Sequence, residues 1–529
     1  MREQPQAWIS RTEVAGAADG PLAGLTFAIK DNIDLAGVPT TAADPRRREP
    51  ADTSATVVTR LLSAGAIALG KTNMDQYATG LVGTRTPYGA CHSVHAPDRI
   101  SGGSSSGSAV VVARGEVDFA LATDTAGSGR VPAALNGLVG IKPSKGLVST
   151  TGVLPACRTL DCVTVLSRDL PTARLAYEQM VGYDQKDPFS RTLVQAPVPS
   201  GRPRVGVPST PLDLDPEYEA PWQEALVQMA KVADLVPVDI AVLLETAGLL
   251  YGGPWLAERW HAFGAAMSDE PGVDPTVRAI VRAGAEVGGA EVFAGLENLA
   301  RLARASEPIW ADIDALLLPV VREHPLIAEV IADPIGVNAR LGRFTNMTNL
   351  LDLCAIAFPG PTTAAGLPFG VQLLAPAGSD DKVCSIAADA LATPRPVTES
   401  GVVRLAVAGA HLTGQPLNAD LRARGGRFET LTRTALDYRM FLVDGPIPRP
   451  GVTRVVDGPG GAGIEVEVWS LPEQALAGFA ATIAPPLGLG PVDLIDGSTV
   501  LGFICTADGA RAERDITEHG GWRGYLATR

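Results

Sequence analysis

The sequence is poor in cysteine, histidine and clustered basic residues, and each shortage excludes a class of protein. Six cysteines in 529 residues are too few for a disulfide scaffold, and no pair has the CxxC spacing of a structural zinc site. The six histidines form no HExxH motif. The net charge of −14 and the absence of a basic stripe argue against a nucleic-acid partner. We therefore expect reduced thiols, no metal and a cytoplasmic location.

Long hydrophobic runs and targeting segments are also missing. The longest uncharged stretch, residues 353–379, is broken by prolines and glycines, so it cannot form one continuous membrane helix. The first twenty residues are polar and carry charges of both signs, unlike a secretory signal peptide. The sequence contains no internal repeat and no low-complexity tract. These absences predict a protein with no membrane partner.

Glycine and proline, by contrast, are abundant. The chain has 57 glycines and 42 prolines, a larger share than the usual total of about 12%. Residues 25–29 have the pattern of a buried strand, residues 53–64 that of a helix and residues 66–69 that of a second strand. Strand, helix and strand in this order indicate a crossover connection in a sheet covered by helices. The sequence therefore predicts an α/β fold.

The character of the sequence changes near residue 400. Before that point, helical periodicity and buried-strand patterns alternate, with helices at 220–235, 239–250 and 277–305 and strands at 315–321 and 370–374. After it come short strand-like runs separated by glycine, proline and aspartate, at 405–408, 441–443, 453–456, 463–468 and 500–504. We expect a first domain of residues 1–392, a proline-bearing linker of residues 393–401, and a smaller β-rich α+β domain of residues 402–529.

Residues 100–152 contain the segment that indicates chemistry. A glycine- and serine-rich loop, GGSSSGS at 102–108, leads into an apolar helix-like run, and TDTAGSGR at 123–130 follows a predicted strand at 119–122. Such a loop can bind phosphate through backbone N–H groups, or supply serine hydroxyls and an anion hole for acyl transfer. The phosphate interpretation fails because neither GxxxxGK[ST] nor a complete GxGxxG fingerprint is present. A flexible linker is disfavoured because the loop lies between apolar elements.

Three motifs in this region resemble the amidase-signature hydrolases: GGSSSGSA at 102–109, TDTAGSGRVPAA at 123–134 and GIKPSKG at 140–146. Residues 28–32 (AIKDN) are similar to that family's catalytic-lysine strand. The resemblance implies an α/β amidase-signature fold with a mixed central sheet covered by helices, and a Ser–cis-Ser–Lys triad. In this sequence the lysine is Lys30, the bridging serine is Ser104 and the nucleophile is Ser128, in the order and spacing that the family shows.

The resemblance narrows to the allophanate hydrolases, a branch of that family. It is carried by residues 73–89, 155–162 and 346–354, and by residues 405–523, which are similar to the second domain of those enzymes. That domain has a γ-glutamyl-cyclotransferase-like fold, which most amidase-signature proteins lack. The likeness is to the stand-alone form. It implies a cytoplasmic hydrolase that needs no cofactor, acts in urea degradation and nitrogen metabolism, and can form a homodimer.

The three triad residues suit the cleavage of an amide. A covalent intermediate divides a difficult hydrolysis into two easier steps. The serine must lose a proton to a neutral lysine, whose usual pKa of about 10.4 has to be lowered by burial or by a positive neighbour. Lys30 ends a buried strand, where burial can do this, and Ser104 would relay the proton. The developing oxyanion would face backbone N–H groups of the turn formed by Thr125, Ala126, Gly127 and Ser128.

Allophanate is small, planar and anionic, so its recognition calls for an arginine. Tyr251 and Arg259 match the family's substrate-binding pair. The structural alternative is that Tyr251 packs in a core and Arg259 pairs with Glu258 or with another acidic residue on a helix. Arg130 and Arg158 are alternative anion partners.

His411, in a turn after the strand at 405–408, matches a residue of the second domain's catalytic site. A lone histidine can equally be structural. The resemblance thus implies amide cleavage of allophanate to ammonia and N-carboxycarbamate, followed by decarboxylation. The alternatives are an amidase for another small carboxylated amide, such as a malonamate or a relative of biuret, and a non-catalytic amidase-like component of a larger assembly. An intact triad and an acidic charge disfavour the non-catalytic component.

Overall fold

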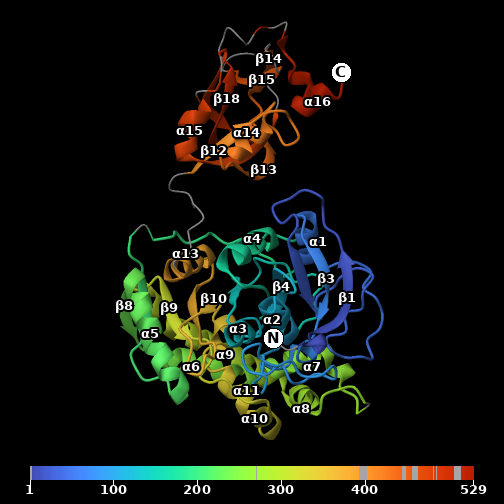
Figure 1. The fold of residues 1–529 in the computed structure, drawn as a ribbon, viewed down its shortest axis with the longest axis vertical. Helices are drawn as coiled ribbons and strands as arrows, with labels where there is room; N and C mark the ends of the chain where they lie inside the picture. Colours follow the sequence, from blue (N-terminus) through green and yellow to red (C-terminus); the bar gives the residue numbers. More distant parts are fainter. Residues whose placement is uncertain are drawn as a thin grey trace. The chain divides into compact units, whose positions relative to one another are not determined.

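The chain forms two compact units, Met1–Pro394 and Arg395–Arg529, each with its own hydrophobic core (Figure 1). The computed structural model describes residues 3–199, 201–269, 271–391, 402–443, 448–455, 463–480, 482–483, 485–505, 511 and 514–528. The predicted linker, residues 393–401, lies outside the described residues. The limits of the two domains therefore stay a prediction.

The larger unit is built on a mixed sheet. Its strands are β1 (Trp8–Val14), β2 (Thr26–Lys30), β3 (Ile67–Thr72), β4 (Phe119–Asp124), β5 (Val139–Lys142), β6 (Cys162–Ser167), β7 (Arg204–Pro208), β8 (Asp234–Val238), β9 (Ala315–Pro319), β10 (Leu353–Pro359) and β11 (Gly370–Pro376). In the described part of the chain their order is β1-β3-β2-β4-β6-β5-β10-β11-β9-β7-β8. β2 pairs in parallel with β3 and β4, and β7 pairs in parallel with β8 and β9. Between them in the sheet, the neighbours β4-β6-β5-β10-β11-β9 pair antiparallel.

Helices cover this sheet, which confirms the predicted fold class (Figure 1). They are α1 (Thr56–Ser63), α2 (Ser106–Ala113), α3 (Arg130–Leu135), α4 (Leu170–Met180), α5 (Pro216–Val232), α6 (Ala241–Gly252), α7 (Trp255–Phe263), α8 (Pro275–Ala283), α9 (Gly289–Ser306), α10 (Ile327–Ala332), α11 (Gly336–Leu341), α12 (Met347–Leu350) and α13 (Asp380–Ala390). α2 packs on β2, β3, β4 and β6, and α3 on β5, β10 and β11. Both helices begin directly after a glycine- and serine-rich loop.

The alternation of side chains along β2 decides where its last residue points. Phe27 and Ile29 belong to the large core shared with α1 and α4, whereas Ala28 belongs to a separate core shared with α2. Because successive strand residues face opposite sides of a sheet, Lys30 lies on the same side as Ala28. The lysine therefore points toward the loop that begins α2.

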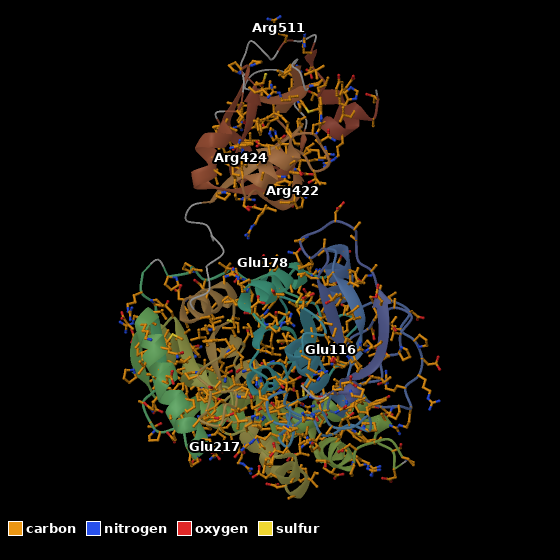
Figure 2. All side chains as sticks on the ribbon, viewed as in Figure 1. Glu116, Glu178, Glu217, Arg422, Arg424 and Arg511 are labelled. Atoms are coloured by element: carbon orange, nitrogen blue, oxygen red, sulfur yellow. The ribbon has the colours of Figure 1, made fainter. Side chains whose placement is uncertain are left out.

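β1 extends the sheet antiparallel to β3 and is fixed there by Glu116 (Figure 2). Trp8 Nε1 donates a hydrogen bond to Glu116 Oε2 at 2.8 Å. Arg11 and Arg114 form ion pairs with the same carboxylate at 2.5 and 2.7 Å. Glu116 lies in the turn between α2 and β4. These contacts tie the sheet edge to the helix that follows the serine-rich loop.

Two predicted helices differ from the structure. The helix expected at 220–235 ends at Val232, and Asp234–Val238 forms β8, because this segment pairs with β7 in a parallel ladder. The helix expected at 277–305 is divided into α8, a 3₁₀ turn at Gly284–Glu286 and α9. Gly284 packs against the carbonyl oxygen of Leu256, where a Cβ atom would lie 2.0 Å away. Close packing of α7 therefore sets the break.

The smaller unit is β-rich, as predicted. Its strands are β12 (Val402–Val407), β13 (Arg427–Arg433), β14 (Tyr438–Val443), β15 (Arg449–Arg454), β16 (Glu465–Pro472), β17 (Leu487–Asp493) and β18 (Thr499–Cys505). Its helices are α14 (Asn418–Ala423), α15 (Glu473–Ala480) and α16 (Trp522–Leu526). Among the described residues the strand order is β13-β16-β12-β18-β15-β14, with β17 paired to β18. The strands β13 and β17 were not predicted from the sequence.

Two further features of the described chain bear on the sequence analysis. None of its helices combines the length and the apolar character that a membrane crossing requires. The six cysteines are all buried, and all are free thiols.

Candidate active site

Lys30 lies at the centre of a buried polar site in the larger unit. Its Nζ contacts Ser104 Oγ at 2.7 Å and Thr123 Oγ1 at 2.7 Å, with the Thr123 carbonyl oxygen at 3.4 Å. Lys30 and Ser104 are both fully buried. β2 and β4 are parallel neighbours, so the end of β2 meets the end of β4 at this point. The register of the two strands therefore places Lys30 beside Thr123, just before the turn formed by Thr125–Ser128.

The surroundings of Lys30 favour its neutral form. Burial lowers the pKa of Lys30 from 10.5 to about 7, and this effect outweighs the opposing charges of Asp75, Asp124 and Asp161. The Lys30 amine forms hydrogen bonds with the hydroxyl groups of Thr123 and Ser104. At pH 7 a large fraction of Lys30 is thus unprotonated and able to accept a proton.

The loop that carries Ser104 is shaped by a buried carboxylate. Asp75 accepts hydrogen bonds from the N–H groups of Val82, Gly83 and Arg85 at 3.0–3.2 Å. The Asp75 N–H in turn donates to the Ser104 carbonyl oxygen at 3.0 Å. The peptide bond between Gly103 and Ser104 is cis. A Cβ atom on Gly103 would lie 2.1 Å from Asp75 Oδ2, so only glycine fits beside this carboxylate.

Ser128 lies in the same site, but its hydroxyl does not contact Ser104. Ser128 Oγ donates to the Gly80 carbonyl oxygen at 3.3 Å, and the Ser105 N–H donates to the Ser128 carbonyl oxygen at 3.3 Å. The two serine loops are therefore adjacent, while the predicted Ser104–Ser128 link is not formed in the described structure. Contacts of this kind often tighten only with substrate bound.

The turn before Ser128 is held by Asp124 at the end of β4. The Gly127 N–H donates to Asp124 Oδ1 at 2.7 Å, and the Gly129 N–H donates to Asp124 Oδ2 at 3.3 Å. Gly127 has φ of +121°, and a Cβ atom there would lie 2.4 Å from Thr345 Oγ1. Because the Gly127 N–H is already used, the predicted oxyanion donors that remain are those of Thr125, Ala126 and Ser128.

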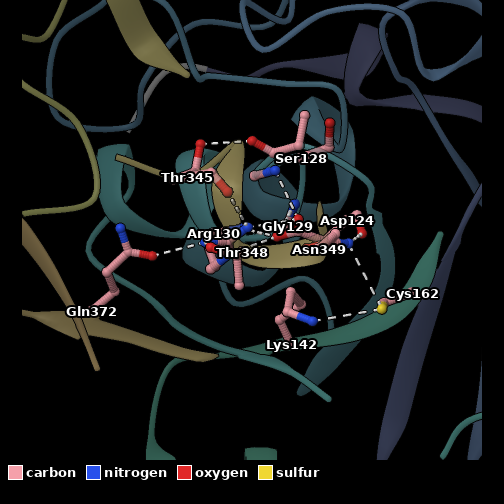
Figure 3. Close-up of polar contacts among 12 residues, drawn as sticks. Asp124, Ser128, Gly129, Arg130, Lys142, Cys162, Thr345, Thr348, Asn349 and Gln372 are labelled. Carbon is pink, nitrogen blue, oxygen red and sulfur yellow. Dashed lines mark hydrogen bonds and ion pairs between the residues drawn. The ribbon is translucent and has the colours of Figure 1, made fainter. Parts of the chain in front are cut away.

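Other residues of the protein hold the Arg130 guanidinium, so Arg130 is not free to bind an anionic substrate, the role that the sequence had left open for it (Figure 3). Its guanidinium is fully buried and forms an ion pair with Asp124 at 2.9 Å. Its remaining N–H groups donate to Thr348 Oγ1, Gln372 Oε1 and the Thr345 carbonyl oxygen. Burial tends to raise the pKa of Asp124, but the charge of Arg130 keeps it below its usual value. The pair anchors the start of α3.

Arg259 has the opposite environment. It is fully buried on α7, and its Nη1 donates to Thr79 Oγ1 at 3.1 Å. Its Nε and Nη2 have no hydrogen-bond partner among the described residues. The Cζ atom lies 5.5 Å from the centroid of the Tyr251 ring, so the two predicted substrate-binding residues are in contact. Thr79 directly precedes Gly80, the residue that contacts Ser128. The Arg259 guanidinium therefore contacts the residue next to Gly80, which accepts the hydrogen bond of Ser128, the predicted nucleophile.

Glu258 does not pair with Arg259, so this part of the structural alternative is wrong, whereas Tyr251 does pack against the main core. The Glu258 carboxylate instead accepts the N–H and Oγ1 of Thr159, at 2.7 and 2.8 Å. In the described chain no carboxylate lies within ion-pair distance of Arg259. Arg158, the other alternative anion partner, is exposed and lies over the Phe189 ring at 5.8 Å.

His411 lies in the smaller unit, after β12, between two aromatic rings. Its ring stacks on Phe503 at 5.0 Å and meets Phe479 edge-on at 5.3 Å. Burial lowers the pKa of His411 to about 4, so the ring is neutral at pH 7. No hydrogen bond joins a ring nitrogen to another described residue. The ring is thus held in place by packing, with its nitrogens available to a ligand.

Sequence reasoning missed several residues of this site: Asp75, Thr79, Thr123 and Asp161. Thr123 was in the quoted TDTAGSGR motif, and a parallel register of the two strands would have placed it beside Lys30. Asp75, Thr79 and Asp161 lie in segments that carried the resemblance to the family, but the resemblance gave them no role in the site. Among the described residues, no group of three or more histidine, cysteine, aspartate and glutamate side chains is arranged to hold a metal ion.

Comparison with family models matches both units. The model described as Amidase matches residues 2–384, and the model described as Allophanate hydrolase C-terminal domain matches residues 403–527.

Comparison with known proteins finds relatives over nearly the whole chain. Urea amidolyase of Saccharomyces cerevisiae is 37% identical over 543 residues, which covers 96% of this chain and 30% of that protein. Urea amidolyase of Lachancea kluyveri is 38% identical over 558 residues, with the same coverage of the two chains. The chain therefore spans less than a third of the length of these relatives. The solved structure of Kluyveromyces lactis allophanate hydrolase has a TM-score of 0.69 at 37% identity, covering 96% of this chain and 89% of its own.

Proposed function

The chain belongs to the amidase family, and from this premise we propose that it hydrolyses the terminal amide of allophanate. The family cleaves amides, so the chain is a hydrolase. Two similarities support allophanate as the substrate. The second unit matches an allophanate hydrolase C-terminal domain, and the solved relative that covers 96% of the chain is named an allophanate hydrolase.

The observation that carries this proposal is the unpaired cation of Arg259. A buried guanidinium without a carboxylate is costly unless a ligand supplies the negative charge. Its free Nε and Nη2 can bind a planar carboxylate through two parallel hydrogen bonds. The contact with Thr79, next to Gly80, keeps that carboxylate close to Ser128. A small substrate with a carboxylate at one end and an amide at the other fits this pairing.

In the proposed acylation step, Ser128 Oγ attacks the carbonyl carbon of the terminal amide. Neutral Lys30 has two N–H bonds for the Thr123 oxygens and a lone pair for the Ser104 hydroxyl proton. Ser104 passes its proton to Lys30 and takes the proton of Ser128. The carbonyl oxygen becomes an oxyanion, stabilised by backbone N–H groups of the Thr125–Ser128 turn. The relay then runs in reverse to protonate the nitrogen, the C–N bond breaks, and ammonia leaves.

In the proposed deacylation step, water takes the place of the amine. It loses a proton through the same relay, attacks the acyl carbon and releases Ser128. The product is N-carboxycarbamate, a dicarboxylate. Its decarboxylation then yields carbon dioxide and carbamate, which breaks down to ammonia and a second carbon dioxide.

A comparison of four substrates tests the proposal. Ammonia release should be fastest from allophanate, slower from malonamate, and slowest from biuret and urea, which lack a carboxylate for Arg259. The purified full chain and a coupled ammonia assay suffice. Equal or better turnover of biuret than of allophanate would contradict the proposed substrate.

Arg259→Gln should raise KM for allophanate at least about tenfold and narrow the gap between allophanate and biuret. The reason is that glutamine retains a hydrogen-bond donor near Thr79 but has no charge for the carboxylate. Steady-state kinetics with both substrates measure this preference. Arg158→Gln is the matched control, because Arg158 is exposed and outside the buried site. An unchanged preference in Arg259→Gln would remove Arg259 as the carboxylate partner.

We also propose that His411 assists the decarboxylation. The neutral ring, held between Phe479 and Phe503, can direct a nitrogen at one carboxylate of the intermediate. His411→Ala should leave the release of the first ammonia unchanged and slow that of carbon dioxide about tenfold or more. Simultaneous time courses of both gases measure this delay. His519→Ala, a histidine of the same unit that contacts Tyr525, is the control. Identical time courses in all three proteins would leave His411 a structural residue.

A further inference from the structure

Asp161, a carboxylate outside the triad, joins the oxyanion turn to a second turn. It directly precedes β6 and is buried. Its Oδ1 accepts Thr125 Oγ1 at 2.5 Å and the Cys157 N–H at 3.2 Å, and its Oδ2 accepts the Ala156 N–H at 2.8 Å. No basic side chain forms an ion pair with it in the described chain. Asp161 is thus held by three hydrogen bonds, and the charge of Arg259 acts on it without an ion pair.

The second turn contacts the helix that carries Arg259. Cys157 Sγ lies 3.7 Å from the Trp255 carbonyl oxygen, and Thr159 binds the carboxylate of Glu258. Both partners are on α7. Asp161 therefore connects the turn that would stabilise the oxyanion with the element that presents the unpaired arginine.

We propose that Asp161 is a positioning residue for amide cleavage, which fixes Thr125 at the head of the oxyanion turn and acts on Lys30 through its negative charge. This inference rests on the proposed function, because Lys30 and Ser128 are the reacting groups there. Asp161 itself touches neither the substrate nor the reacting atoms.

The geometric part of this role follows from Thr125. The bond from its hydroxyl to a buried carboxylate is charge-assisted and therefore strong. Thr125 is the first residue of the turn, so its side-chain anchor fixes the peptide planes that follow it. Loss of one oxyanion donor typically lowers the rate about 10²–10³-fold. A small rotation of the turn should therefore lose a measurable part of this rate enhancement.

The electrostatic part follows from the carboxylates around Lys30. Burial has the largest effect and lowers the pKa of Lys30 to about 7, while Asp75, Asp124 and Asp161 oppose it. Asp124 is paired with Arg130, and the charge of Arg85 acts on Asp75. Burial raises the pKa of Asp161 to about 6, so this group is ionised at pH 7 and above. Removing its charge should lower the pKa of Lys30 further.

Three variants separate the two parts of the proposal. Asp161→Asn should lower kcat for allophanate about tenfold to a hundredfold. The rising limb of its rate–pH profile should move to lower pH by about half a unit or more. Thr125→Val, which removes the hydrogen bond but leaves the carboxylate in place, should lower kcat and move the limb less than Asp161→Asn does. Asp380→Asn is the matched control, since Asp380 is equally buried and accepts two bonds from Ser144 on another part of the sheet. It should change neither quantity.

Each outcome decides a separate question. A wild-type kcat in Asp161→Asn, or a limb that stays in place, would overturn the proposal. Where Asp161→Asn does not fold, Thr125→Val is compared with Thr125→Ser, and equal kcat values in that pair would overturn it. The proposed function fails by a different result, namely a wild-type protein that turns over biuret as fast as allophanate or faster.

Discussion

Ser128→Ala is expected to lower ammonia release from allophanate by about 10⁴-fold or more, with the protein still folded. The variant removes the only atom that can carry the acyl group in the proposed mechanism. The fold should persist because Ser128 Oγ makes a single long hydrogen bond, to the Gly80 carbonyl oxygen at 3.3 Å. Single-turnover ammonia release measures the loss, and a thermal melt checks the fold.

Ser106→Ala is the matched control for this variant. Ser106 is also fully buried and lies in the other serine loop, but its hydroxyl donates to the Asn73 carbonyl oxygen at 3.4 Å and contacts the Cys91 thiol. It should keep activity within about threefold of the wild type. A sulfonyl fluoride, which reacts with activated serines, should label the peptide that contains Ser128 in the wild type and in Ser106→Ala. Turnover at the wild-type rate in a folded Ser128→Ala protein would show that another group is the nucleophile.

The family resemblance implies that Lys30 and Ser104 lie together, and the structure contains this contact at 2.7 Å. Lys30 ends β2 and Thr123 is near the end of β4, and parallel neighbours bring their carboxyl ends together. The last contact of the relay could not be predicted. The orientation of the Ser128 hydroxyl is a rotamer choice, and the Gly80 carbonyl oxygen that receives it lies 48 residues away.

The resemblance names Arg259 as the anion partner, but the residue pattern alone could not exclude Arg130 or Arg158. Arg130 is closer to the nucleophile in the chain, but its charge is neutralised by Asp124 six residues before it. Its other partners lie 215–242 residues away. Arg259 is adjacent to a glutamate in sequence, yet that glutamate binds Thr159. Only long-range contacts, which a local pattern does not contain, distinguish the two environments.

The fold shows the same division between local and long-range information. Strands with continuous apolar runs, such as β9 and β11, were predicted because burial on both faces leaves an unmistakable pattern. β13 was missed because nearly all its residues are exposed, so no alternation marks it. β17 contains Gly488, Gly490 and Pro491, residues typical of turns, and its pairing with β18 makes it a strand.

Lys30→Ala is expected to lower kcat at least about 10³-fold, and the wild-type rate is expected to depend on pH in a defined direction. The active form of Lys30 is the neutral amine. Burial lowers the pKa of Lys30 to about 7, so the rate should rise from pH 5.5 to about 7 as the proton is lost, and should level off above pH 8. A profile of log(kcat/KM) against pH, taken with allophanate, measures the slope and the midpoint of this rise.

The matched control for Lys30 is another buried lysine of the same sheet. Lys142 ends β5, and its Nζ contacts the Pro143 carbonyl oxygen at 2.7 Å and Cys162 Sγ at 3.6 Å, so it is buried without touching either serine (Figure 3). Lys142→Met should keep the rising limb near pH 7, whatever it does to stability.

In Lys30→Ala, added methylamine should restore part of the activity in proportion to its neutral form, because a small amine can occupy the vacated volume. A Lys30→Ala protein that keeps the wild-type kcat would exclude Lys30 as the base. A wild-type rate that falls as pH rises through 7 would exclude the neutral lysine as the active form, because the protonated amine cannot accept the proton of Ser104.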